Sequence, residues 1–170
     1  MPPSAPEPWQ RGPIEGVPPL LMPAAHALLQ AREDVEHVLQ SLTTVELWQR
    51  PGGAASVGFH VRHLAGALDR LLTYARGEAL GDAQKRAKAA EAREEGLDAA
   101  ALRAEVDAAL AAALAQIRST SAAQLLEPRG VGRQQLPSNV LGLVFHAAEH
   151  ATRHAGQAVT TGKIVAGLRR

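Results

Sequence analysis

The sequence contains no cysteine. Without a thiol side chain the protein cannot form a disulfide, a thiolate zinc site, an iron–sulfur cluster or a cysteine nucleophile. Aromatic residues make up only 3% of the 170 residues, and the formal net charge is only +1. Because a protein that binds the phosphate backbone of nucleic acids needs a basic surface, this charge balance argues against a nucleic-acid partner.

Long apolar runs are missing as well. No stretch approaches the roughly 18 uninterrupted apolar residues of a membrane span, and the Pro-rich residues 1–16 lack the apolar segment of a secretory signal. We therefore expect a cytoplasmic protein without a membrane partner. The GxGxxG and Walker patterns of nucleotide sites and the GxSxG pattern of serine hydrolases are also absent from the sequence.

Alanine, in contrast, makes up about a fifth of the chain. Alanine is the strongest helix former because its side chain loses no rotamer freedom in a helix. The length fits one domain, and contents of 46% hydrophobic and 21% charged residues are typical of a globular protein. We expect residues 1–19, which contain seven prolines, to form an extended arm, and residues 20–170 to form one helical domain.

Apolar residues recur at helical spacing in four separate segments of the chain. Helices are predicted over residues 20–42, 56–76, 98–119 and 138–162. The predicted fold class is therefore all-α, a four-helix bundle with a Pro-rich N-terminal arm. The polar, mixed-charge residues 77–97 predict a long crossover connection with some helical content.

Local signals mark the ends of these helices. Ser56 and Asp98 are typical N-caps, and Gly77 is a typical residue after a helix end. Residues 127–137 contain glycine and proline and predict a connection, with no convincing strand anywhere in the chain. In the N-terminal arm, Trp9 could either anchor the arm to the domain or lie in a mobile tail.

Five of the seven histidines fall into two groups. His60 and His63 are three residues apart, whereas His146, His150 and His154 follow one another at intervals of four. Because four residues is about one helical turn, the second group forms a stripe that faces inward or borders the core. His60 and His63 likewise lie on or beside the apolar face of their helix.

Imidazole is a neutral ligand that suits zinc, nickel, copper and iron. Two rings from one helix, joined by His60 or His63 from a facing helix, could hold one ion and leave a coordination position open. The alternative is that the histidines are hydrogen-bonded core residues. Every buried ring then needs polar partners of its own, so five inward histidines in a small Ala-rich bundle favour a metal site.

Other titratable residues are predicted to lie outside this cluster. His26 and His37 fall on the polar face of the first helix, where we expect them to be largely exposed. Asp69 lies on the same polar face of its helix as Thr73, and it is predicted to face solvent or form a salt bridge. Glu149 lies on the solvent-exposed side of the last helix and is a weak candidate for a general base. No residue is assigned as catalytic.

Two segments of the sequence resemble the DinB/YfiT-like family of metal-dependent four-helix proteins. Residues 56–64 (SVGFHVRHL) are similar to the family's pattern of Ser followed by His-Leu at the start of the second helix. Residues 146–157 (HAAEHATRHAGQ) are similar to its final-helix pattern, His-x3-His-x-Gly-Gln. In architecture, the resemblance covers roughly residues 20–165.

The resemblance implies a divalent metal, with zinc or nickel the best candidates, at one end of the core. Matched position by position, the family's metal-binding histidines correspond to His63, His150 and His154. His60, His146 and Gln157 would then orient these ligands or line the pocket. The family also implies a homodimer.

Some members of this family are transferases and isomerases that use low-molecular-weight thiols. For this chain the resemblance implies a metal-dependent transferase or hydrolase that activates water or such a thiol toward a small-molecule substrate. Three neutral imidazoles would leave the +2 charge of the ion uncompensated, which favours that chemistry. The alternatives are a non-catalytic, stress-related or dimerising bundle and a small-molecule-binding module that uses the same pocket without turnover.

Overall fold

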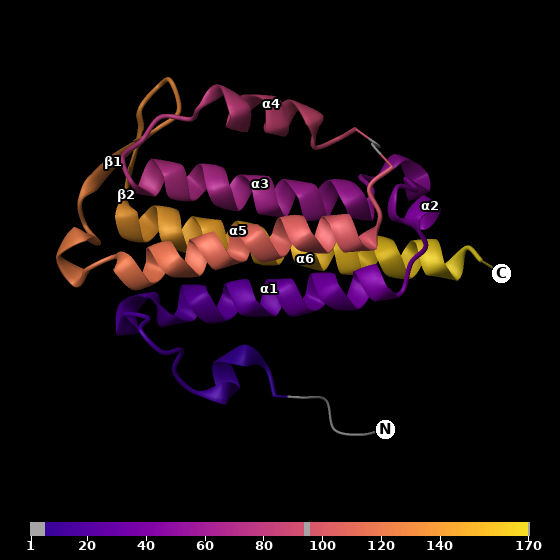
Figure 1. Ribbon diagram of the computed structural model, residues 1–170, viewed down its shortest axis with the longest axis horizontal. Helices are drawn as coiled ribbons and strands as arrows, with labels where there is room; N and C mark the ends of the chain where they lie inside the picture. The colour runs from indigo at the N-terminus through magenta and orange to yellow at the C-terminus, as the bar shows by residue number, and fades with distance from the viewer. Residues whose placement is uncertain (1–5, 94–95, 170) are drawn as a thin grey trace.

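The computed structural model describes residues 6–93 and 96–169. Within these residues the protein is mostly helical, with six α-helices and one two-stranded hairpin (Figure 1). The α-helices are α1 Met22–Gln40, α2 Thr44–Leu47, α3 Val57–Ala75, α4 Asp82–Ala90, α5 Ala99–Ser119 and α6 Val140–Gly167. The strands are β1 Pro128–Val131 and β2 Leu136–Asn139, and 3-10 turns cover Pro8–Arg11, Pro19–Leu21, Pro51–Gly53 and Ala122–Gln124.

The four long helices α1, α3, α5 and α6 lie side by side (Figure 1). Helix α6 packs between α1 and α3, and α5 packs against the same two helices. Helices α3 and α5 run in the same direction, because Arg62 lies 3.6 Å from Glu105 near one end and Gln116 donates to the Leu72 carbonyl near the other. The connection between them must therefore return along the length of the molecule, and α4 forms part of that return.

Capping residues set where the helices begin and end. The side chains of Ser56 and Asp98 accept hydrogen bonds from the backbone of Phe59 and Ala101 at 3.1 and 2.9 Å, so both predicted N-caps are confirmed. Each such cap contributes about 1 kcal/mol. Gly77 follows α3 with a φ of 80°, as predicted, because glycine adopts this left-handed conformation without strain.

The prediction of no strand is wrong for residues 128–139. Strands β1 and β2 pair antiparallel, with Pro128 opposite Asn139 and Val131 opposite Leu136. Each strand has only four residues, and neither has the apolar alternation by which a strand is recognised in a sequence. Proline within a strand also lowers the expectation of pairing.

Two further predictions are corrected by packing. The last helix was expected to end at Gly162 but continues to Gly167. A Cβ atom at Gly162 would collide with Val38, so this glycine permits close contact with α1 instead of ending the helix. Thr73, expected on the wet face of its helix, is only 3% exposed, because Gln84 of α4 covers it and donates to its hydroxyl at 2.8 Å.

The described part of the N-terminal arm runs along α1 (Figure 1) and contains the 3-10 turn Pro8–Arg11, so it is not simply extended. Arg11 forms an ion pair with Glu33, with one nitrogen–oxygen distance of 2.8 Å. His26 lies 3.0 Å from the Gly12 carbonyl and is partly covered by the arm, contrary to prediction, whereas His37 is exposed as expected. Trp9 is 62% exposed, and its indole nitrogen donates to Glu7 within the arm at 2.7 Å.

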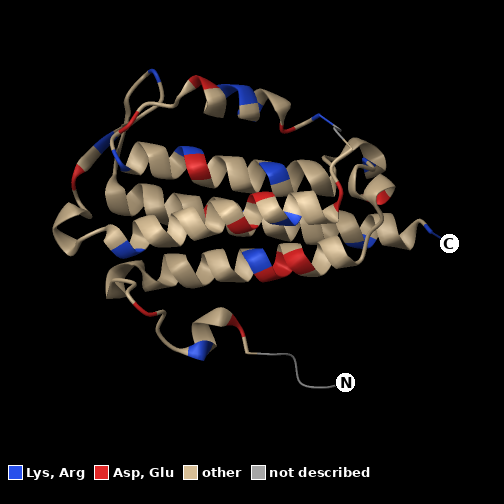
Figure 2. Ribbon diagram, in the orientation of Figure 1, with Lys and Arg blue, Asp and Glu red and all other residues tan. Residues whose placement is uncertain are grey.

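Charged residues of both signs lie on α3 and α4, and those of α1 are grouped in one part of the helix (Figure 2). The mixture on α4 agrees with the polar, mixed-charge connection that the sequence predicts. None of the helices in the described part of the chain is long and apolar enough to cross a membrane.

Candidate metal centre

The two groups of histidines meet where α3 packs against α6. His60 and His63 occupy the first two turns of α3, while His150 and His154 lie near the middle of α6. The helices are antiparallel, so the ring of His60 lies opposite that of His154 and the ring of His63 opposite that of His150. The centroids of these ring pairs are 5.3 and 5.2 Å apart.

His63, His150 and His154 form a compact set of nitrogen donors. One nitrogen from each ring lies within 4.8 Å of the others. The Nε2 atoms of His63 and His150 are only 3.0 Å apart. Two nitrogens that bind one zinc ion tetrahedrally at about 2.1 Å lie about 3.4 Å from each other, so the arrangement fits a three-histidine metal site.

In two of these rings a neighbouring side chain contacts the Nδ1 atom, which we call the outer nitrogen of the ring. His63 Nδ1 donates to Glu91 Oε2 at 2.7 Å, and His154 Nδ1 lies 3.1 Å from His60 Nδ1. A partner on one ring nitrogen fixes the orientation of the ring and leaves the other nitrogen for a metal. The third ring, His150, has its Nδ1 buried without a hydrogen-bond partner.

Burial keeps two of the three rings in the neutral form that binds metals. It lowers the pKa of His154 to about 4, and the neighbouring His63 and His150 add to the effect. Burial also lowers the pKa of His150, as does the charge of His63. Both rings are therefore neutral near pH 7, and no proton has to leave them before they bind an ion.

The neighbour of His154 is also held in its neutral form. His60 is 7% exposed, and its burial lowers its pKa, with a further contribution from His63. A neutral His60 can either donate to His154 Nδ1 or accept from it. His60 therefore contacts a candidate ligand, as expected of a residue that orients the site.

Sequence reasoning missed Glu91, which was placed in the polar connection. This residue is 5% exposed and forms an ion pair with Arg70 as well as its hydrogen bond to His63. Burial opposes its ionisation, but the hydrogen bonds from His63 and Arg70 outweigh burial and lower the pKa of Glu91. The sequence position of Arg70 was the one signal that could have revealed an acidic partner. Arg70 lies two helical turns after His63, on the same inward stripe of its helix, and a buried cation requires a nearby anion.

The remaining candidates lie at the edge of this centre or outside it. The half-exposed ring of His146 has its centroid 5.5 Å from that of His150, and its Nδ1 lies 3.4 Å from Glu149. Glu149 is in turn ion-paired with Arg153. Gln157 is exposed and lines a neighbouring cavity. Asp69 is exposed as predicted and accepts a hydrogen bond from Gln84.

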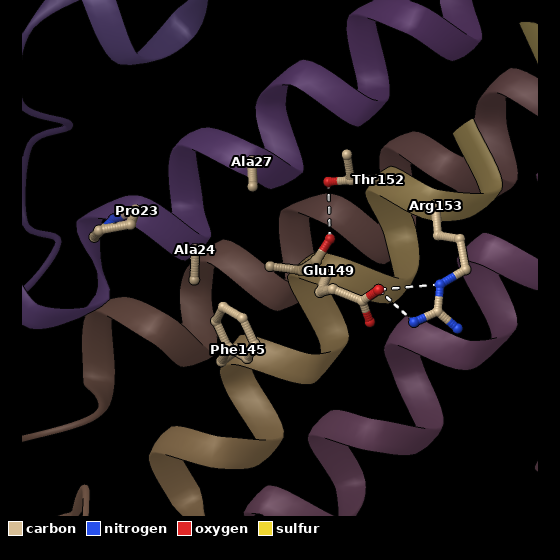
Figure 3. A pocket seen from close by; sticks show the side chains of 8 residues that line it. Pro23, Ala24, Ala27, Phe145, Glu149, Thr152 and Arg153 are labelled. Atoms are coloured by element: carbon tan, nitrogen blue, oxygen red, sulfur yellow. Dashed lines mark hydrogen bonds and ion pairs between the residues drawn. The ribbon is translucent and has the colours of Figure 1, made fainter. Parts of the chain in front are cut away.

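Two cavities lie along α6, and Arg153 lines both, but only the first has a histidine of the centre, His60, in its lining. The first, a cavity of 710 Å³, is lined by His60, Gln157 and Thr160, among others. An apolar groove of 390 Å³ lies between α1 and α6. In Figure 3 the ring of Phe145 forms one side of this groove, facing Ala24 and other small side chains of α1.

Comparison with known proteins agrees with this fold and centre. The family model of the DinB superfamily matches residues 27–158, which is more than half of the chain, so the protein belongs to the DinB superfamily. This superfamily is metal-binding in general. The resemblance inferred from the two histidine segments is thereby confirmed.

A solved structure is similar over most of the chain. It is described as the crystal structure of the conserved protein of locus from Enterococcus faecalis, with 21% identity and a TM-score of 0.67. The match covers 85% of this chain and 95% of that chain, and it shows a shared fold. Among curated proteins none matches.

Proposed function

We propose that the protein is a metal-dependent enzyme in which His63, His150 and His154 bind one divalent ion, zinc or nickel. The observation that supports this most is the convergence of three rings from two helices, with the outer nitrogens of two of them held by neighbouring side chains. In this proposal α1, α3, α5 and α6 act as the four-helix bundle that the sequence predicts.

A divalent ion bound by three neutral imidazoles would supply Lewis acidity that lowers the pKa of a water or thiol at its open position. The contribution of the chain is to hold the rings. Glu91 and His60 contact the outer nitrogens of His63 and His154, so these rings need little reorganisation to bind an ion. No carboxylate belongs to the donor set, so the charge of the ion stays uncompensated.

The cavity that His60 lines favours a small-molecule substrate. Gln157 and Thr160 offer hydrogen bonds in this cavity, and Arg153, which is ion-paired with Glu149, lies at its edge. We propose a transferase-like reaction with a low-molecular-weight thiol as the second substrate. The thiol and the homodimer stay predictions.

The test begins with protein purified without an affinity tag, loaded with zinc or nickel and dialysed. Low-molecular-weight thiols are then offered together with small electrophiles, and consumption of the thiol is measured for the loaded protein, the chelated protein and His150→Ala. His37→Gln is the matched control, because His37 is an exposed histidine outside the centre. We expect turnover by the loaded wild type and the control alone.

Two results would contradict the proposal. A wild type that retains no stoichiometric ion would support the non-catalytic bundle. A wild type that binds one ion but turns over neither thiol nor hydrolysable substrates would support the small-molecule-binding module.

A further inference from the structure

The connection between α3 and α5 brings one acidic side chain into contact with the metal centre. We propose that Glu91 is a positioning residue, which holds His63 in the orientation and tautomer needed to bind the ion. This inference rests on the proposed function, because it assigns a role at the same centre. It adds a contribution from a segment outside the four long helices.

The burial of Glu91 sets it apart from the rest of its segment. Among the described residues of the connection, 77–93 and 96–97, it is the one buried residue, and α4 itself has none. A carboxylate is costly to bury unless it is paired and hydrogen-bonded. Glu91 meets this condition with His63 on one oxygen and Arg70 on the other.

Helix α3 has a gap at Gly66, between His63 and Arg70, that accommodates this carboxylate; we call this gap the notch. His63, Gly66 and Arg70 are three and four residues apart, so they share one stripe of the helix. A Cβ atom at Gly66 would collide with Glu91 Oε1 and lie 2.7 Å from Arg70 Nη1. The absence of a side chain at Gly66 thus allows Glu91 to reach His63.

The two contacts of Glu91 act on different oxygens. Arg70 occupies Oε1 and balances the negative charge, which leaves Oε2 for the Nδ1–H of His63. With its proton on Nδ1, the His63 ring has its lone pair on Nε2, the nitrogen that lies 3.0 Å from His150 Nε2. The ring is therefore turned toward the other ligands before an ion binds.

The experiment compares metal affinity with the stability of the metal-free fold. Zinc affinity is measured by competition with a chromophoric chelator for wild type, Glu91→Gln and Glu91→Ala. Outer partners of this kind change metal affinity by about 10- to 100-fold. We expect a loss in that range for Glu91→Ala and a smaller loss for Glu91→Gln, which retains an oxygen that can accept from His63.

A spectrum adds a readout that a purely structural role of Glu91 would not change. With cobalt(II) in place of zinc, the visible absorption bands report the ligand geometry, and we expect them to shift in Glu91→Ala. Melting temperatures of the chelated proteins measure the structural effect separately. The matched control is Glu46→Gln, another glutamate paired with an arginine, Arg169, but outside the centre. Its affinity and spectrum should equal those of the wild type.

A third variant protects the test against failure to fold. Gly66→Ala fills the notch without removing the carboxylate, and we expect it to weaken zinc binding as well. If Glu91→Ala does not fold, the zinc affinities of Glu91→Gln and Gly66→Ala test the role of Glu91 instead. Folded variants at these two positions that bind zinc as tightly as the wild type would overturn the role of Glu91. A wild type that binds neither zinc nor nickel would instead overturn the proposed function.

Discussion

Helix α6 has two contrasting contacts within one molecule. Toward α3 it presents His150 and His154, which meet other histidines through polar contacts. Toward α1 its packing is apolar and close, with Gly162 seated against Val38. The contact with α1 supplies apolar burial, whereas the contact with α3 also holds groups that are costly to bury. Stability and chemistry are thus concentrated on different sides of the same helix.

The largest expected effect comes from the apolar side. Leu28 of α1 is 2% exposed in the core, so Leu28→Ala should lower the free energy of unfolding by about 2–5 kcal/mol through lost burial and a cavity. Denaturant unfolding of the chelated protein measures this loss. The folded fraction should still bind one ion. A strong loss of metal binding would show that the two sides of α6 are coupled.

A smaller effect is expected where α1 and α6 approach most closely. Gly162→Val places a branched side chain against Val38, and such overpacking costs about 1–3 kcal/mol. Gly156→Val is the matched control, because a Cβ atom there meets nothing within 4 Å while the helix-propensity change is the same. Unfolding free energies that are equal for the two variants would show that α1 and α6 tolerate a wider spacing.

The polar side should make the metal-free protein sensitive to acid. Because the pKa of His154 falls from 6.5 to about 4 on folding, the unfolded chain binds protons more readily between these values. Burial of the neutral His154 ring therefore costs no free energy of unfolding above pH 6.5, where the ring is neutral in both states. As the pH falls toward 4, the unfolded chain takes up the proton first, and the free energy of unfolding decreases. Chelated wild type should lose stability in this window, and His154→Ala should lose less. Parallel pH curves for the two proteins would contradict this assignment.

The smallest effect is expected on the exposed face of α1. His37→Gln should change the free energy of unfolding by no more than about 0.5 kcal/mol, as is usual at surface positions. His26→Gln removes the contact with the Gly12 carbonyl and should affect the arm more than the core. Denaturant unfolding, together with limited proteolysis of the arm, separates these outcomes. A loss above about 2 kcal/mol for His37→Gln would mean that this face is not simply solvated.

What the sequence could predict depended on how local each feature is. Ser56 and Asp98 bond to residues three positions ahead, so their caps were visible in the sequence. The spacing of His150 and His154 likewise placed both rings on one helical stripe. The spacing did not decide between His60 and His63 as their partner. That choice came from the family resemblance.

Other features depend on contacts between distant segments. Glu91 pairs with His63 and Arg70 across more than twenty positions, and nothing in its own charged segment distinguishes it from its neighbours. The β1–β2 hairpin has four residues in each strand, too few for a recognisable alternation. Gly162 looks like a helix end in the sequence, and its role emerges only when Val38 is packed against it.

The central claim is that the histidines serve metal binding and not the stability of the core. The most direct measurement is metal stoichiometry and melting temperature for wild type and His154→Ala, each with and without chelator. A 170-residue helical domain has enough apolar core to fold without an ion. We therefore expect the mutant to lose the metal yet melt like the chelated wild type. A chelator that leaves the wild-type melting temperature unchanged, together with a mutant that melts far lower, would contradict it.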